Sequence, residues 1–163
     1  MLRLICPLLI CLWSANVIAS GKNYIGNFSC EEAPFGLHLP GSYSSLLRIA
    51  PVKSNTVIDT ENWEGYTTSR RDITFEGLSL RVITFSNDLE RYMTALATVT
   101  KNGPWNANIF KLGQPLQEVQ RALERYDAAL SSEDSIGNEA GELKFIFGPD
   151  AKVKSMNYSC YTG

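Results

Sequence analysis

The chain carries almost the same four residues near its beginning and near its end, and this repetition constrains the fold more than any other feature. The two quartets are Asn27-Phe28-Ser29-Cys30 and Asn157-Tyr158-Ser159-Cys160. In each quartet the aromatic residue and the cysteine are two residues apart, so on a β-strand they share one face. We therefore expect a first and a last strand that both turn an aromatic ring and a thiol toward the core.

The first twenty residues have the pattern of a cleavable secretory signal. A short positive head precedes a mostly apolar stretch over 4–13, and we expect cleavage after Ala19 or Ser20. A membrane anchor is one alternative, but it needs about 20 apolar residues, and polar residues interrupt this stretch. A lipoprotein signal is another, since 8–11 resembles a bacterial lipobox, although Ile10 stands where that motif takes a small residue. We expect a secreted protein or, in a bacterium, a periplasmic one.

Removal of the signal leaves two cysteines, Cys30 and Cys160. An even pair of cysteines in an exported chain predicts a disulfide, and this one would close a loop over nearly the whole mature chain. Two unpaired, buried thiols are the alternative. Asn27 and Asn157 are also Asn-x-Ser acceptors for glycosylation, which applies only to a eukaryotic source.

Length and charge limit the classes of function. The mature chain, 21–163, has the size of a single domain with its own hydrophobic core. It carries 14 basic and 17 acidic residues, because Arg3 is the only charged residue in the signal. A net charge of −3 without a basic stripe argues against nucleic-acid binding, and no second apolar run predicts a membrane span after cleavage.

Two helices are predicted. Pro115 suits the first helical position, and the apolar residues after it recur at helical spacing: Leu116, Val119, Ala122, Leu123 and Tyr126. A turn over 39–42 leads into a shorter helix that Pro51 ends.

Strands occupy most of the remaining chain. Residues rich in Thr, Ile, Val, Phe and Tyr, separated by turn signals, predict antiparallel strands over about 66–75, 78–86 and 91–100. The last twenty residues predict a hairpin that turns at Gly148-Pro149-Asp150. The stretch 52–62 predicts a loop with one short strand, and 131–141 predicts a polar loop. The predicted fold class is α+β: one antiparallel sheet of about six strands with two helices packed on one face.

The two halves of the chain resemble each other. Residues 35–100 and 109–160 each run through a helix, a loop and a hairpin, and Leu80 to Asp88 aligns with Leu143 to Asp150. Either a helix-plus-hairpin unit has been duplicated, or two ordinary units look alike because the same physics shaped them.

The second half also resembles a known repeat. It has a glycine before a helix that carries a valine, then a hairpin whose turn has Asp before a basic and an apolar residue: Gly113, Val119, Asp150, Lys152 and Val153. This resembles the repeat of the β-lactamase-inhibitor-protein-like group, which includes outer-membrane assembly lipoproteins of the SmpA type. The chain departs from that repeat where Leu123 precedes Glu124 instead of a glycine. The resemblance implies a helix-on-sheet layer used for binding proteins, while fold alone does not determine function.

Groups for catalysis are few. His38 is the only histidine and stands between two leucines before a turn, and both remaining cysteines are expected to be oxidised. The supply of histidine and cysteine is too thin for a zinc site, and there is no phosphate loop or calcium loop. A two-carboxylate glycosidase is not strictly excluded. We expect a protein without catalytic residues, metal or cofactor.

Binding signals are clearer. Trp63, Tyr66 and Trp105 stand in or beside turns, where aromatic residues often anchor interfaces, but they also close small cores. Arg70 and Arg71 are a cation pair on a predicted strand, and alternation turns one of them outward. These five residues are the candidate binding residues.

Three functions follow. The first is an exported, non-catalytic protein that binds another protein of the envelope or extracellular space, as an inhibitor or an immunity-type factor. The second is an accessory protein of envelope assembly, as the SmpA-type resemblance implies. The third is a small-ligand or carbohydrate binding module that uses Trp63, Tyr66 and Trp105 as a stacking platform.

Overall fold

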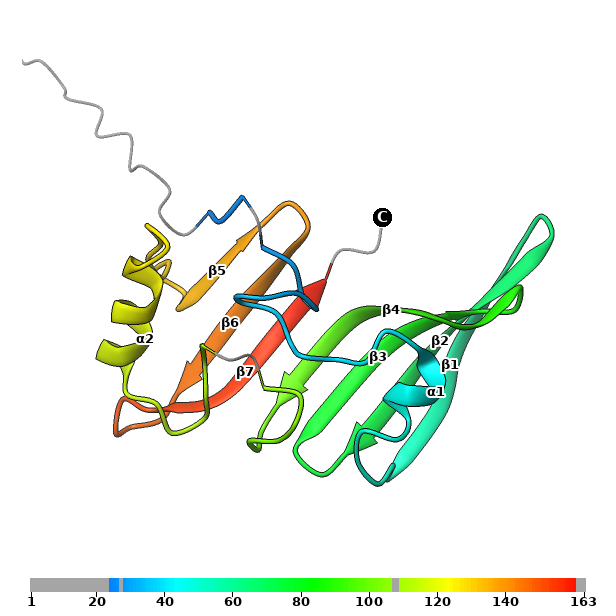
Figure 1. Ribbon diagram of the computed structural model, residues 1–163, viewed down its shortest axis with the longest axis horizontal. Helices are drawn as coiled ribbons and strands as arrows, with labels where there is room; N and C mark the ends of the chain where they lie inside the picture. Colours follow the sequence, from blue (N-terminus) through cyan, green and yellow to red (C-terminus); the bar gives the residue numbers. More distant parts are fainter. Residues whose placement is uncertain (1–23, 27, 107–108, 161–163) are drawn as a thin grey trace, which may run out of the picture.

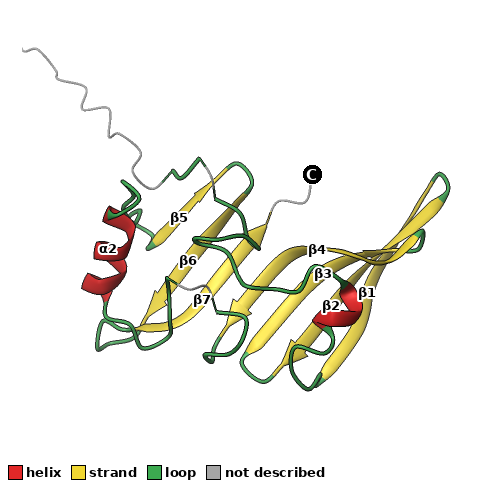
Figure 2. Cartoon of the chain, viewed as in Figure 1, coloured by secondary structure: helices red, strands yellow, loops and turns green. Residues whose placement is uncertain are grey.

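A computed structural model of the chain describes residues 24–26, 28–106 and 109–160, in which seven antiparallel strands form one sheet accompanied by two short helices (Figures 1 and 2). The elements in chain order are α1 (Tyr43–Leu46), β1 (Ser54–Trp63), β2 (Tyr66–Phe75), β3 (Leu78–Phe85), β4 (Asp88–Val99), α2 (Leu116–Glu124), β5 (Ser135–Asn138), β6 (Gly141–Phe147) and β7 (Val153–Cys160). The strand order is β1-β2-β3-β4-β7-β6-β5. The strands β4 and β7, each the last of a meander, therefore pair in the middle of the sheet, and the α+β class is confirmed.

One strand is longer than predicted, and another was not predicted at all. The stretch 52–62, expected as a loop with a short strand, is largely the ten-residue strand β1, which pairs with β2 along its length. All its residues are exposed, so the alternation of apolar and polar residues that reveals a half-buried strand is absent. The expected loop over 131–141 contains β5, which pairs with β6 across a two-residue turn; its four residues, Ser-Ile-Gly-Asn, lack the β-branched run typical of a strand.

One face of the sheet carries the core. Residues that pair across antiparallel strands point to the same side, and two such rows run across the middle of the sheet. The first row is Leu143, Tyr158, Ala97, Leu80 and Ile73, and the second is Phe145, Met156, Val99, Leu78 and Phe75. All ten are buried, and they share one cluster with Leu46 of α1 and with Val119, Ala122 and Leu123 of α2.

The two helices lie at different ends of the sheet. α1 contacts β4, whereas α2 lies near β5 and β6 (Figure 1). Packing of both helices on one face, and an internal duplication, stay predictions. Opposite the core, an ion pair between Asp72 and Arg81 (2.8 Å) and the exposed Leu96 lie on the second face. This ion pair lowers the pKa of Asp72, chiefly through the hydrogen bond from Arg81.

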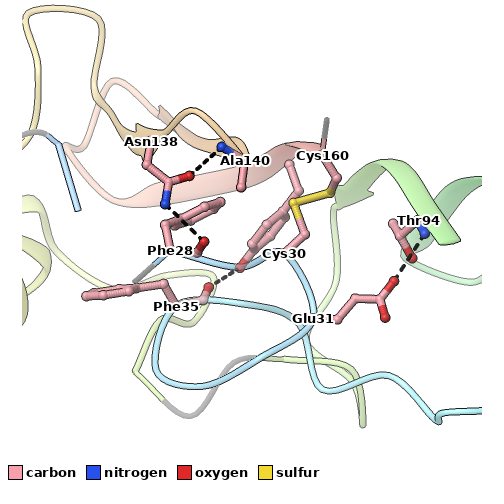
Figure 3. The surroundings of a disulfide bond; sticks show 9 residues. Phe28, Cys30, Glu31, Phe35, Thr94, Asn138, Ala140 and Cys160 are labelled. Atoms are coloured by element: carbon pink, nitrogen blue, oxygen red, sulfur yellow. Dashed lines mark hydrogen bonds between the residues drawn. A yellow bond between two sulfur atoms is a disulfide. The ribbon is translucent and has the colours of Figure 1, made fainter. Parts of the chain in front are cut away.

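The predicted disulfide is present and joins the start of the described chain to its last strand. Cys30 and Cys160 are 130 residues apart, with their Cα atoms at 5.9 Å (Figure 3). Phe28 and Tyr158 are buried beside them, as expected, but Phe28 and Cys30 lie on an irregular segment, not on a strand. Side chains hold that segment instead: Asn138 Nδ2 donates to the carbonyl of Phe28 (3.2 Å), and the Tyr158 hydroxyl donates to the carbonyl of Phe35 (3.1 Å).

Three further predictions concern the signal, the two glycosylation acceptors and membrane spans. The predicted signal and the acceptor Asn27 lie outside the described residues. Asn157 is half-buried on β7, where it pairs with Thr98 and Lys144. Within the described part of the chain, neither helix is long and apolar enough to cross a membrane.

Candidate functional site

The β1–β2 hairpin reaches beyond the rest of the sheet, with the β3–β4 turn beside it (Figure 1). We call residues 58–70 and 83–93 the hairpin arm. Its two turns are tied together, because Ser86 donates from its N–H to the carbonyl of Thr67 (2.9 Å), and the N–H of Thr67 donates to Ser86 Oγ (2.8 Å). The arm is therefore one unit made of two hairpins.

Aromatic rings line one face of the hairpin arm. The rings of Trp63 and Tyr66 stack at 6.4 Å between centroids, and Tyr66 in turn lies 6.3 Å from Phe85. The guanidinium of Arg91 lies over the Phe85 ring, 4.5 Å from its centre. Such aromatic and cation–π contacts stabilise the arrangement of exposed rings before any partner arrives.

Local sequence explains the geometry of this row. Gly65 adopts φ +87°, which a two-residue turn of this kind requires and which few other residues adopt. The turn sets Trp63 opposite Tyr66, so the two rings emerge on the same side. Trp63 Nε1 donates to Thr68 Oγ1 (3.2 Å), which holds the indole while its ring stays 55% exposed.

The tip of the second hairpin adds an apolar group. Leu89 is 75% exposed, the highest fraction among the large apolar side chains that the structure describes. Beside it, Asp88 Oδ1 accepts from the backbone N–H groups of Glu90 and Arg91 (3.3 Å each), which shapes the turn. Hydrogen bonds from Ser44 lower the pKa of Glu90 and tie the arm to α1. Leu89 is thus presented on a braced turn.

The hairpin arm is acidic. It carries five carboxylates, Asp59, Glu61, Glu64, Asp88 and Glu90, against two guanidinium groups, Arg70 and Arg91. Arg70 contacts Asp59 (3.3 Å) and Glu61 (3.7 Å) within the same surface. Two carboxylates therefore surround the one guanidinium of Arg70, so an acidic partner gains little from it and the group keeps a net negative charge.

Arg71 lies on the opposite face of β2 from Arg70, as alternation along a strand requires. Its Nη1 donates to Asn55 Oδ1 (3.3 Å), and Asn55 in turn donates to the hydroxyl of Tyr43 on α1 (3.0 Å). Its Nε is buried without a hydrogen-bond partner among the described residues. The two adjacent arginines do not form one cationic site.

Trp105 is not part of this surface. It is only 3% exposed, packs 6.3 Å from the Phe75 ring and donates from Nε1 to the carbonyl of Lys101 (3.2 Å). The predicted stacking platform of Trp63, Tyr66 and Trp105 is therefore not assembled, and Trp105 closes the core. Of the five candidate residues, the structure brings Trp63, Tyr66 and Arg70 to one surface and leaves Arg71 and Trp105 elsewhere.

Phe85, Leu89 and Arg91 were missed from the sequence. The turn signal at Ser86-Asn87-Asp88 places Phe85 at a strand end, so a hairpin register drawn on paper brings it close to the next strand. Tyr66 lies on β2, and the turn at Glu76-Gly77 sets Thr68 of β2 opposite Phe85. The register of the predicted hairpin between 66–75 and 78–86 therefore already places Phe85 beside Tyr66.

A hollow beside the disulfide is lined mainly by the N-terminal segment and β4. Glu31 Oε1 accepts from the backbone N–H of Thr94 (3.1 Å; Figure 3), and the buried Tyr92 hydroxyl donates to the carbonyl of Pro40. Burial, and then the charge of Glu31, raises the pKa of Tyr92 well above its usual range. These bonds join the N-terminal segment to β4, so both groups serve the fold.

The remaining groups considered for chemistry lie apart. His38 is exposed, and its backbone N–H donates to the carbonyl of Trp105 (3.0 Å). In the ranges that the structure describes, no group of three His, Cys, Asp or Glu side chains is close enough to hold a metal ion. The aromatic row on the hairpin arm, with Trp63 exposed and Tyr66 and Phe85 half-buried, is the candidate site. Comparisons of this chain with protein-family models, with curated proteins and with solved structures find no match.

Proposed function

We propose that this chain is an exported, non-catalytic protein that binds another protein through its hairpin arm, as an inhibitor or an immunity-type factor of the envelope or extracellular space. The observation that carries the proposal is the exposure of Trp63 and Leu89 on a projecting arm whose rings are already stacked. Large apolar side chains at the end of an arm gain little from the chain's own core, but they bury area when a partner covers them.

Preorganisation supports a tight complex. The turn at Gly65, the hydrogen bond from Trp63 to Thr68 and the contact of Arg91 with Phe85 hold the rings without a partner. A side chain that is already held loses less conformational entropy on binding, so more of the contact energy appears as affinity. The disulfide likewise holds the N-terminal segment against the end of β7 before any partner binds.

A small-ligand or carbohydrate site is supported less well. The faces of Trp63 and Tyr66 are turned toward each other, at an interplanar angle of 11°, and Trp105 is buried away from them. A sugar would find one outer indole face, whereas a protein surface can cover the whole row and Leu89.

The finer features of the predicted architecture belong to the same proposal. We take 1–20 as a signal and 21–163 as one domain built from two units, each a helix followed by a meander. The pairing of β4 with β7, and the continuous row of Leu80, Ala97, Tyr158 and Leu143, support a relation between the units. The disulfide supports an oxidising compartment.

The test is affinity capture from native envelope and secreted extract with matched variants. Leu89→Ser and Leu96→Ser each replace an exposed leucine of β4, one on the hairpin arm and one on the open sheet face. We expect one protein captured at a stoichiometric level by the unmodified chain and by Leu96→Ser, and lost with Leu89→Ser or Trp63→Ala. Equal capture by all variants, or no stoichiometric partner, would contradict the proposal.

A further inference from the structure

The sheet has one long free edge. β1 is the first strand in the order, and no strand of the described chain lies on its outer side. The opposite edge, β5, has only four residues and is partly covered, because the N–H of Ile25 donates to the carbonyl of Gly137 (2.9 Å). Backbone N–H and C=O groups along an open edge accept a further strand. β1 is therefore the edge where a partner's backbone has room to pair.

Thr67 shows which β1 groups face outward. It pairs with Asn62, yet its own N–H and C=O bond to Ser86 on the side away from β1. In an antiparallel pair this makes Asn62 a non-hydrogen-bonded position, so its N–H points away from β2. Val57 and Ile58, each 45% exposed, add apolar side chains along the same strand.

One acidic side chain protects this edge. The register shifts between Val57 and Asp59, and Asp59 Oδ1 accepts from the N–H of Thr60 (2.8 Å). Bulges and charges of this kind hinder indiscriminate strand pairing. A cation of an incoming strand competes for the Asp59 carboxylate and so releases the Thr60 N–H for pairing.

Charge distinguishes between two candidates for pairing with β1, a second copy of this chain and a basic strand of another protein. β1 from Ser54 to Trp63 carries Asp59 and Glu61 and no basic residue. A second copy pairing antiparallel through the middle of β1 brings these carboxylates close to their own counterparts, and like charges facing each other destabilise a strand pair. A strand with lysine or arginine is instead attracted, because the whole hairpin arm has an excess of carboxylates.

We infer that the partner contributes an extended, basic segment that adds to the sheet as an eighth strand along β1. The aromatic row then covers one end of that segment, since Trp63 is the last residue of β1. This inference rests on the proposed function and specifies its partner's chemistry and binding mode.

The test uses the full chain in its exported and oxidised form with two capped peptides of about nine residues, long enough for one strand. One peptide alternates lysine with valine and the other alternates glutamate with valine. Fluorescence anisotropy gives the dissociation constants, and amide hydrogen exchange shows whether β1 becomes protected. We expect the lysine peptide to bind at least about tenfold more tightly, with its advantage reduced by salt.

Two kinds of variant locate the site. Asn62→Pro removes an outward N–H, and we expect it to weaken lysine-peptide binding by about tenfold, whereas Asn62→Ala retains it. Asp59→Lys combined with Glu61→Lys reverses the surface charge of β1, and we expect the glutamate peptide to become the preferred one. The second variant keeps the test decisive if proline disturbs the hairpin.

The inference is overturned if neither peptide binds, if both bind equally, or if protection appears outside β1. Its failure is distinguishable from failure of the proposed function. A native partner lost with Leu89→Ser but captured normally by Asn62→Pro leaves the proposed function standing without strand addition. A partner insensitive to both substitutions, or absent, removes the proposed function.

Discussion

Removal of the disulfide should be the most destabilising change that leaves the core side chains in place. The Cys30–Cys160 bond spans 130 residues, and the chain-entropy model assigns a loop of that length about 5 kcal/mol at 25 °C. Native disulfides of small secreted domains contribute about 2–5 kcal/mol when measured by removal, so the effect falls within that range. We use alanine as the replacement because Cys30 is buried, and a serine hydroxyl there would add its own desolvation penalty.

The assay is unfolding in urea, followed by the fluorescence of the buried Trp105. Cys30→Ala, Cys160→Ala and the double variant are compared with the unmodified chain. Either single substitution breaks the same covalent bond, so each should lose nearly the whole free energy, and the double variant should be no worse. The unmodified chain under a reducing agent should match them.

Two results would refute this reasoning. A loss below about 1 kcal/mol in all three variants would mean that the unfolded chain is not restrained as the entropy model requires. Single losses that add to give the double loss would mean that local packing at each cysteine, and not the cross-link, provides the stability.

Three further predictions use urea unfolding followed by circular dichroism, because Trp105→Ala removes the fluorescent residue. Trp105→Ala should lose about 3–5 kcal/mol because a buried ring leaves a cavity, whereas Trp63→Ala should change stability by less than about 1 kcal/mol, and equal losses would contradict the assignment of Trp63 to an exposed surface. Tyr158→Phe should lose about 1–3 kcal/mol of unfolding free energy because the buried carbonyl of Phe35 loses its donor. Burial also raises the pKa of Tyr158, so above about pH 10 the unfolded state releases the Tyr158 proton before the folded state does. The unmodified chain should then lose up to about 1.4 kcal/mol per pH unit through this group, and the phenylalanine variant should lack this loss. Gly77→Ala should lose clearly more than Gly65→Ala, since both have positive φ but only at Gly77 would a Cβ collide with Lys101; similar losses would show that backbone conformation alone sets the penalty.

Several elements were readable because their signals are local. β2 was predicted with its observed bounds, 66–75, because two turn signals frame a run rich in β-branched residues. α2 was predicted from Pro115 and the spacing of Val119 and Leu123, both of which are buried. Pro115 is its N-cap, with an extended backbone, and the first helical residue is Leu116, one position later than predicted. β4 begins at Asp88 instead of about residue 91, since its first residues are exposed and follow a turn signal, and only their pairing with β3 makes them a strand.

The candidate site could be predicted from the sequence only in part, namely where a turn sets which residues face each other across a hairpin. Trp63 and Tyr66 are separated by one turn, so their meeting follows from the hairpin itself. The position of Phe85 beside Tyr66 follows in the same way from the turn at Glu76-Gly77, which sets Thr68 opposite Phe85. Trp105 was wrongly placed on the surface, because a tryptophan at a Gly-Pro turn can close the core as well as anchor an interface.

The sequence by itself determined which residues alternate on the central strands and, to within one residue, where the longer helix begins, and it predicted the pairing of Cys30 with Cys160 that the structure shows. The first two depend on periodicity and on proline geometry, and the third on the even number of cysteines that remains after the predicted signal. Only the tertiary structure decided that β1 is a fully exposed edge, that β4 pairs with β7 and that Trp105 is buried. Each of these depends on which distant segments lie side by side, and that is set by the packing of the whole sheet on its core, not by any stretch of residues taken alone.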